Sequence, residues 1–140
     1  MLVQEFITRT EKDYMITTLL KYYKVHNVKV KYKPMDNYAE YDVDRGILNL
    51  SSKYKEIKPS QLKDFLITIL HEIRHAMDAK KYGWRKFKDM YELEMNMIAQ
   101  GHYPDKNDPY KDNKYEIEAE EFGQKNWMKW NNKFKKDGLI

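Results

Sequence analysis

The sequence predicts an α+β domain with an N-terminal helix, a small three-stranded sheet, and helices that continue to the C-terminus. Apolar residues recur at spacings of three and four in long stretches, whereas residues 28–50 show the alternation that is typical of strands. The chain has 140 residues, which is the size of one ordinary domain. We therefore expect residues 1–140 to form a single domain.

The first helix is predicted over residues 8–27. Its apolar residues lie at helical spacing, and Thr10 followed three residues later by Asp13 has the pattern of a capped start. Asn27 is a residue type that often ends a helix. The helix should therefore lead directly into the sheet.

Three short strands are predicted next. Residues 28–33 alternate between apolar residues and Lys up to Pro34, which is typical of a half-buried strand. Two further strands, 38–43 and 47–50, are separated by the turn residues 44–46. These two strands should form a hairpin.

Three helices are predicted in the remainder of the chain. The most apolar one spans residues 62–83, and Ser60 with Gln61 and Asp64 offers N-cap chemistry for it. We expect this helix to be central in the domain. Another helix is predicted over 85–99. Residues 102–114 are rich in Pro, Asp and Asn and should form a loop, and a final helix should span 115–136.

The composition excludes several classes of protein. The absence of Cys removes disulfides, thiolate metal sites and Cys nucleophiles. No cationic start is followed by an apolar stretch, so no secretory signal is predicted and we expect a cytoplasmic protein. The longest apolar stretch, residues 65–70, is far too short for a membrane span. We therefore expect no membrane partner.

The net charge of +4 is concentrated at the C-terminus, where residues 125–140 contain five Lys and one Asp. This pattern is typical of a solvated helix end. A nucleic-acid surface is the alternative, because Trp127, Trp130 and Phe134 are interleaved with Lys. Their spacing of three and four is also that of a core-facing helix, which we prefer, so nucleic acid is not an expected partner.

One motif indicates chemistry. His71, Glu72 and His75 form an H-E-x-x-H pattern within the most apolar helix. Two His four residues apart lie one turn apart on one helix face, so both rings can bind one metal ion. Glu72, about 100° round the helix, can then reach the metal-bound water and act as a general base. Structural His with a surface Glu is the competing interpretation, and it would require other polar partners for all three side chains.

A catalytic zinc ion needs a third protein ligand, which without Cys must be His, Asp or Glu. Asp78 lies two turns after His71 and is better placed to orient the ring of His75. His102 in the polar loop is a second candidate, although no spacing positions it. Acidic residues within 116–121 of the final helix are the richest source.

Glu116 is the preferred ligand among these acids. It precedes Ala119 by three residues and shares the face that Ala119 should turn towards the core. Glu118 and Glu120 are expected to rotate away from that face, and Glu121 is expected to be a solvated acid. Two His and Glu116 would then hold the metal.

The H-E-x-x-H motif followed by Glu116-x-x-Ala119-x-x-Phe122 resembles the gluzincin-type zincin metallopeptidases, nearest to the ImmA/IrrE-like group. The similarity spans residues 29–127. It implies a minimal zincin-like domain and a Zn²⁺-dependent endopeptidase in which Glu72 is the base. Proteins of this kind are often found in mobile elements and phage-related settings.

Peptide hydrolysis also requires a hydrogen-bond donor for the oxyanion that forms on the substrate carbonyl. Tyr103, Tyr110, Tyr115 and His102 lie in or beside the predicted loop and are the candidates, with no pattern to choose among them. At the family level, we expect the strand at residues 47–50 to be the sheet edge that pairs with an extended substrate.

Two functions of different classes follow from these observations. The first is a zinc metalloendopeptidase that acts on a protein or peptide substrate. The second is a non-catalytic binding protein on the same scaffold, which would use its basic aromatic C-terminal helix for a protein or nucleic-acid partner. The intact Glu72 favours the first, because a purely structural metal site has no use for this carboxylate.

Overall fold

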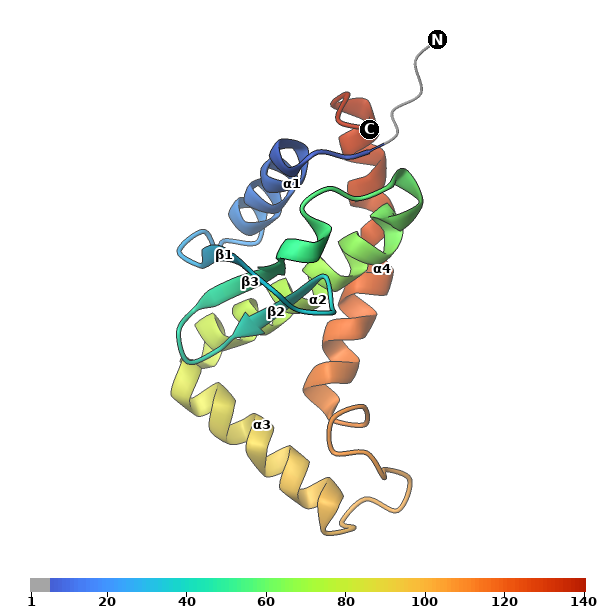
Figure 1. Cartoon of the computed structure of the whole chain (residues 1–140). Coiled ribbons are helices and arrows are strands. Elements are labelled where there is room, and N and C mark those ends of the chain that lie inside the picture. Colours follow the sequence, from blue (N-terminus) through green and yellow to red (C-terminus); the bar gives the residue numbers. More distant parts are fainter. Residues whose placement is uncertain (1–5) are drawn as a thin grey trace.

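The computed structural model describes residues 6–140 and has the predicted α+β class (Figure 1). In chain order, the elements are α1 (Arg9–Tyr22), β1 (Lys29–Lys33), β2 (Ala39–Asp42), β3 (Ile47–Ser51), the 3-10 turns η1 (Ser52–Tyr54) and η2 (Pro59–Gln61), α2 (Leu62–Tyr82), α3 (Trp84–Ala99) and α4 (Lys114–Lys136).

The sheet is mixed, with the strand order β1-β3-β2. β3 pairs antiparallel with β2, so the predicted hairpin is confirmed, and it pairs in parallel with β1 on its other side. The prediction that residues 47–50 form an edge strand is therefore wrong. Leu48 and Leu50 are each 1 % exposed, which suits a central strand, and the edges of the sheet belong to β1 and β2.

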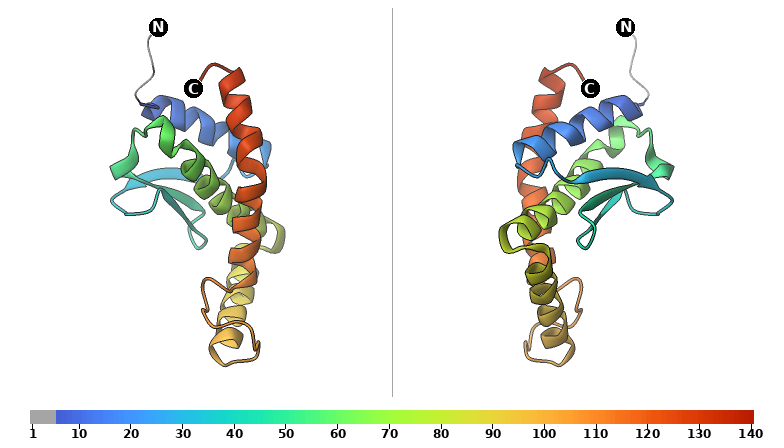
Figure 2. Two further views of the ribbon diagram at one scale, coloured as in Figure 1. Left: turned by 90° about the vertical axis from the view of Figure 1, so that its right-hand side faces the viewer. Right: turned by 90° about the vertical axis from the view of Figure 1, so that its left-hand side faces the viewer.

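α2 lies between the sheet and α4, as the two views in Figure 2 show. Its apolar residues Phe65, Leu66, Ile69 and Leu70 are at most 1 % exposed and belong to the main core. α1 packs into the same core through its buried face. The most apolar helix of the chain therefore lies at the centre of the domain.

α4 crosses α2 closely at Gly123. A Cβ atom added to Gly123 would lie 2.7 Å from the backbone oxygen of Ile67 and 3.2 Å from its Cγ2. Because the nearer atom belongs to the backbone of α2, the helices could accept a methyl group only by moving apart. The absence of a side chain at this position therefore sets the separation of the two helices.

We expect Gly123→Ala to lower the free energy of unfolding by about 1–3 kcal/mol, the usual effect of overpacking. This loss should appear even though Ala favours helix by about 1 kcal/mol over Gly. Denaturant unfolding measures it, with Lys125→Ala on the exposed face of α4 as the control. A Gly123→Ala protein as stable as the wild type would show that the crossing is not tight.

α1 begins within one residue of its predicted start, but its capping residue and its end differ from the prediction. Its N-cap is Thr8, whose hydroxyl accepts the N–H of Glu11, while the Glu11 carboxylate accepts the N–H of Thr8. The capping box therefore lies two residues earlier than expected. The helix stops short of Asn27 because Lys24 adopts a left-handed conformation with φ of 61°.

Of the residues predicted to offer N-cap chemistry for α2, Gln61 occupies the N-cap position, without a side-chain hydrogen bond to the helix, and η2 leads directly into the helix. The side-chain oxygen of Gln61 accepts the N–H of Lys58 at 2.8 Å.

β1 is more exposed than the half-buried strand that we expected, with Val30 39 % exposed, because β1 lies at the sheet edge.

The C-terminal half of α4 packs into the core. Trp130 and Phe134 are 1 % and 0 % exposed, and the indole N–H of Trp130 donates to the hydroxyl of Tyr23 at 2.9 Å. The preferred prediction of a core-facing helix is confirmed at these two positions.

Among residues 6–140, no helix combines the length and apolar character needed to cross a bilayer.

α3 leaves the body of the molecule at Gly83, and its far end lies beside the loop that leads into α4 (Figure 1). Gly83 has φ of 85°, a conformation that side-chain-bearing residues rarely adopt, so the sharp change of direction requires Gly. Residues 100–113 then return the chain to the start of α4.

Polar contacts hold α3 against the start of α4. The buried carboxylate of Glu94 accepts the backbone N–H of Lys114 at 3.0 Å and the ammonium of Lys106 at 3.4 Å. The side-chain amide of Asn113 donates to the backbone oxygen of Tyr91 at 3.3 Å. A negative charge at the first turn of α4 also suits the helix dipole.

We expect Glu94→Gln to lower the free energy of unfolding by about 1.5–3 kcal/mol at pH 7, the usual range for a hydrogen bond to a charged group. Burial would raise the pKa of Glu94, but the bonds from Lys114, Tyr103 and Lys106 lower it overall from 4.5. The stability from a lowered carboxylate pKa is present above the unfolded-state pKa and disappears as the pH falls through the folded-state value.

Unfolding of both proteins at a series of pH values tests this prediction. The difference between wild type and Glu94→Gln should shrink below a pH of about 4.5. Glu92→Gln, an exposed position on α3, is the matched control. A difference that stays constant with pH would show that the charge of Glu94 has no role.

Candidate metal centre

His71 and His75 lie one turn apart on the face of α2 that meets the first turn of α4. There the Oε1 atom of Glu116 lies 2.8 Å from Nε2 of His71 and 2.7 Å from Nε2 of His75. The Glu116 side chain is only 8 % exposed. The structure therefore brings together the three residues that the sequence predicted as metal ligands.

These three atoms fit a divalent cation. Zinc binds nitrogen and oxygen ligands at about 2.0–2.1 Å in a tetrahedron, so two such ligand atoms lie about 3.3 Å apart. The side chains would need to separate by only about half an ångström to admit the ion. Two imidazoles and one carboxylate leave a fourth position for a water or a substrate, as in catalytic zinc sites.

Glu72 is the other acid near the two His, and the ligand atoms of His71, Glu72 and His75 lie within 4.8 Å of one another. Glu116 is the better third ligand because one of its oxygens contacts both Nε2 atoms within hydrogen-bond distance. Glu72 is then free for a different role.

Two further side chains contact the ligands. The hydroxyl of Tyr91 donates to Oε2 of Glu116 at 2.6 Å, and Nδ1 of His71 lies 3.1 Å from Oε2 of Glu120. The prediction that Glu120 rotates away from the site is wrong. Glu120 follows Glu116 by four residues, which is about one turn, so both lie on the same face of α4.

The remaining acids lie outside the group of ligands. Glu118 faces the guanidinium of Arg74 at 3.6 Å, and Glu121 is exposed as predicted. Asp78 accepts the Nε–H of Arg74 at 3.3 Å and makes no hydrogen bond to His75. Its Oδ2 atom and Nδ1 of His75 are buried, and neither has a partner within the part of the chain that the structure describes.

The electrostatics of the site favour a bound cation. Burial lowers the pKa of His71, but contacts with Glu116 and Glu120 and the charge of Glu72 raise it above 6.5 overall. Burial raises the pKa of Glu116, but hydrogen bonds from the two imidazoles outweigh this effect and hold it well below 4.5. An ionised carboxylate therefore faces imidazole protons that a divalent metal ion can replace.

Glu72 lies beside the ligands and next to the edge strand β2. Its Oε2 atom accepts the backbone N–H of Tyr41 at 3.1 Å. Burial raises the pKa of Glu72, and the charges of His75 and His71 oppose this shift without cancelling it. A carboxylate with a raised pKa is a better proton acceptor than an ordinary Glu.

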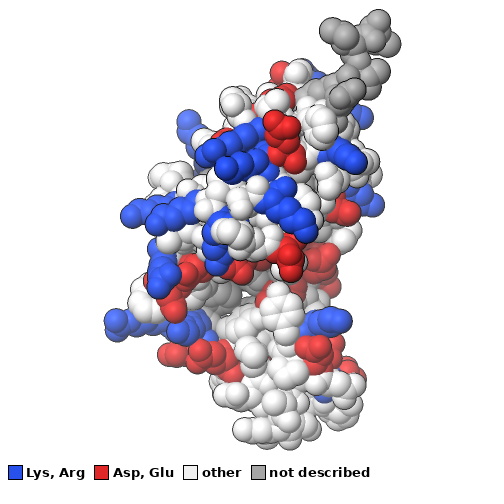
Figure 3. All heavy atoms as spheres, in the orientation of Figure 1, with Lys and Arg blue, Asp and Glu red and all other residues white. Residues whose placement is uncertain are grey.

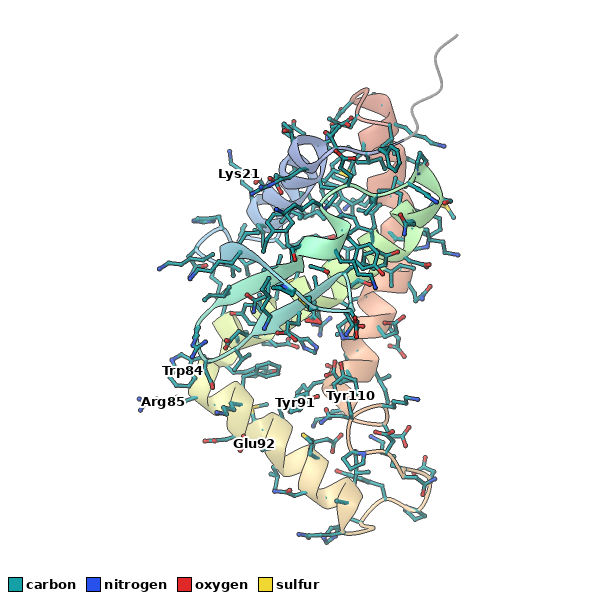
Figure 4. All side chains as sticks on the ribbon, in the orientation of Figure 1. Lys21, Trp84, Arg85, Tyr91, Glu92 and Tyr110 are labelled. Atoms are coloured by element: carbon teal, nitrogen blue, oxygen red, sulfur yellow. The ribbon has the colours of Figure 1, made fainter. Side chains whose placement is uncertain are left out.

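A cleft of about 490 Å³ opens onto these residues between β2, α3 and the start of α4. Tyr41 and Glu72 line one side, and Phe87 and Tyr91 line the α3 side. Figure 3 shows the hollow below the sheet, with Asp and Glu side chains around it. In Figure 4, the side chains of Tyr91 and Tyr110 lie in the space between α3 and α4.

Tyr110 is the one predicted oxyanion donor that lines the cleft. Although Tyr110 is 56 % exposed, desolvation of its hydroxyl in the cleft and the charges of Glu116 and Glu72 raise its pKa to about 12. Its hydroxyl therefore keeps its proton across the neutral range and can donate a hydrogen bond.

The other predicted donors lie elsewhere. The His102 ring is 3.3 Å from the side-chain oxygen of Gln100, and the hydroxyl of Tyr103 contacts the sulfur of Met97 at 3.9 Å. Tyr115 is 6 % exposed and packs in the smaller core cluster under α3. None of these three candidates lines the cleft.

Sequence reasoning missed two contributors to the site, Tyr41 and Tyr91. Tyr41 contacts Glu72 through its backbone N–H, which every residue type except Pro has, so the identity of its side chain could not predict this contact. Tyr91 is one of 12 Tyr in the chain, and no spacing relates it to the H-E-x-x-H motif. Only the three-dimensional arrangement of α3 and α4 identifies them.

In comparisons with known proteins, no family model, curated protein or solved structure matches this chain. The similarity to ImmA/IrrE-like peptidases therefore stays a prediction from the sequence motif. The function is therefore inferred from the geometry of the site.

Proposed function

We propose that this chain is a zinc-dependent metalloendopeptidase that hydrolyses peptide bonds of a protein substrate. One observation supports this above all others. A single carboxylate oxygen of Glu116 contacts the Nε2 atoms of both His71 and His75, while Glu72 remains outside this group and borders the cleft. The arrangement separates three ligands from one base, as metal-assisted hydrolysis requires.

Each side chain has a defined role in this proposal. Bound zinc would polarise the scissile carbonyl and make water acidic enough to attack it near neutral pH. Glu72 takes the proton from the attacking water and passes it to the leaving amine. Tyr110 donates a hydrogen bond to the oxyanion that develops on the substrate carbonyl.

The substrate would bind along the edge of β2. The N–H of Tyr41 points away from β3, because it donates to Glu72 and not to the neighbouring strand. No strand among the described residues pairs with this outer edge of β2, so an extended peptide could pair with its backbone groups other than the N–H of Tyr41, which Glu72 already binds. Because β3 lies in the centre of the sheet, we assign the pairing with substrate to the edge strand β2 and not to residues 47–50.

The cysteine-free composition fits action in the cytoplasm on a protein substrate. The alternative, a non-catalytic binding protein with an aromatic C-terminal surface, has less support. Trp130 and Phe134 are buried and cannot stack on a partner. A structural metal site would also have no use for a carboxylate placed like that of Glu72.

Incubation of the zinc-loaded protein with an unfolded protein such as reduced casein tests the proposal. We expect fragments that disappear when a chelator removes the metal and return when zinc is added back. If the protein binds zinc in stoichiometric amounts and cleaves no unfolded protein or peptide, the alternative function is favoured.

A further inference from the structure

We propose that Tyr91 on α3 is a positioning residue that aligns the carboxylate of Glu116 for zinc, so that metal binding depends on how α3 is held against α4. This inference concerns the metal centre on which the proposed function rests. It is tested by metal binding and requires no peptide cleavage.

The two oxygens of the Glu116 carboxylate have different partners. Its Oε2 atom accepts the hydroxyl of Tyr91 at 2.6 Å, while its Oε1 atom contacts both imidazoles. A carboxylate can rotate and can bind a metal through one or both of its oxygens. The Tyr91 hydrogen bond occupies one oxygen and so holds the other between His71 and His75.

Tyr91 is itself held between two helices. Its hydroxyl donates to the carboxylate of Glu116 on α4. The backbone oxygen of Tyr91 accepts the side-chain amide of Asn113, the N-cap residue of α4. Tyr91 therefore joins α3 to α4 at both its backbone and its side chain.

Tyr91 differs from the other residue of α3 that contacts this region, Phe87. The ring of Phe87 packs 6.2 Å from that of His75 and 5.5 Å from that of Tyr115, centroid to centroid, but it makes no hydrogen bond to a ligand. Tyr91 also lines the cleft (Figure 4). One side chain thus contacts both the space for substrate and a metal ligand, which makes the metal site sensitive to the placement of α3.

Tyr91→Phe is the direct test, because it removes one hydroxyl and keeps the ring. We expect the zinc affinity, measured by competition with a chromogenic chelator, to fall by about 10–100-fold. The cobalt-substituted protein should also show altered visible absorption bands, because the carboxylate is free to bind differently. Tyr115→Phe makes the same chemical change in the neighbouring aromatic cluster and should leave zinc affinity unchanged.

A double-mutant cycle with Glu116→Gln separates positioning from general structural damage. If Tyr91 acts through Glu116, then Tyr91→Phe should have little further effect on the weak zinc binding of Glu116→Gln. An equal loss of affinity in both backgrounds would overturn the proposal. Unchanged affinity and cobalt bands in the single Tyr91→Phe variant would overturn it as well.

This outcome is distinct from failure of the proposed function. A protein that binds zinc tightly, loses affinity on Tyr91→Phe and cleaves no peptide would support the positioning role and contradict the peptidase. Peptide cleavage by the wild type, together with unchanged zinc affinity in Tyr91→Phe, would support the peptidase and contradict the positioning role of Tyr91.

Discussion

Replacement of Glu72 by Gln should lower the rate of peptide hydrolysis by at least about 100-fold, the usual contribution of a general base. Gln has nearly the same shape as Glu but cannot accept the proton of the attacking water. Zinc content should remain that of the wild type, because Glu116 and the two His supply the ligands in our assignment. The measurement is the initial rate of cleavage of a fluorogenic peptide, alongside metal analysis of the same sample.

Glu121→Gln is the matched control for this prediction. Glu121 is an exposed acid on α4 outside the cleft, so its replacement should leave the cleavage rate unchanged. A Glu72→Gln protein that cleaves at the wild-type rate would contradict the role of Glu72 as base. Loss of zinc from Glu72→Gln would instead show that Glu72 is a ligand.

Glu116→Gln should lower zinc affinity by more than about 100-fold, because it removes a direct ligand, whereas loss of a residue that only supports a ligand typically costs 10–100-fold. The neutral amide also removes the negative charge that balances the cation. Hydrolysis should be lost at low zinc concentrations. Competition with a chelator measures the affinity.

Asp78→Asn provides the contrast for Glu116. Asp78 is bonded to Arg74 and makes no hydrogen bond to either His, so we expect it to keep zinc with wild-type affinity. If Asp78→Asn lost zinc and Glu116→Gln retained it, the assignment of the third ligand would be wrong.

Much of the fold follows from local patterns in the sequence. The periodicity of apolar residues predicts α2, α3 and α4 closely, because each buries one face in a core and ends at Gly or at polar residues. The order of the strands in the sheet could not be predicted from local patterns. The pairing of β1 with β3 depends on contacts between residues far apart in the chain, and alternation within a strand does not specify its neighbours.

In the site, too, residues related by local spacing were predictable, whereas contacts between separate elements were not. His71, Glu72 and His75 were predictable because their spacing is local, and Glu116 because it shares a helix face with Ala119. Glu120 was predictable as well, since it follows Glu116 by one turn, but the argument from Ala119 alone placed it wrongly. Tyr91 was not predictable, because its hydrogen bond to Glu116 depends on how α3 and α4 meet.

The most direct test of the central claim is anomalous X-ray scattering from crystals of the zinc-loaded protein, recorded on both sides of the zinc absorption edge. We predict one strong peak per chain, bonded to Nε2 of His71, Nε2 of His75 and an oxygen of Glu116. Glu72 should lie outside bonding distance of this peak. A peak bonded to Glu72 in place of Glu116, or no peak at these residues in zinc-saturated crystals, would contradict the account.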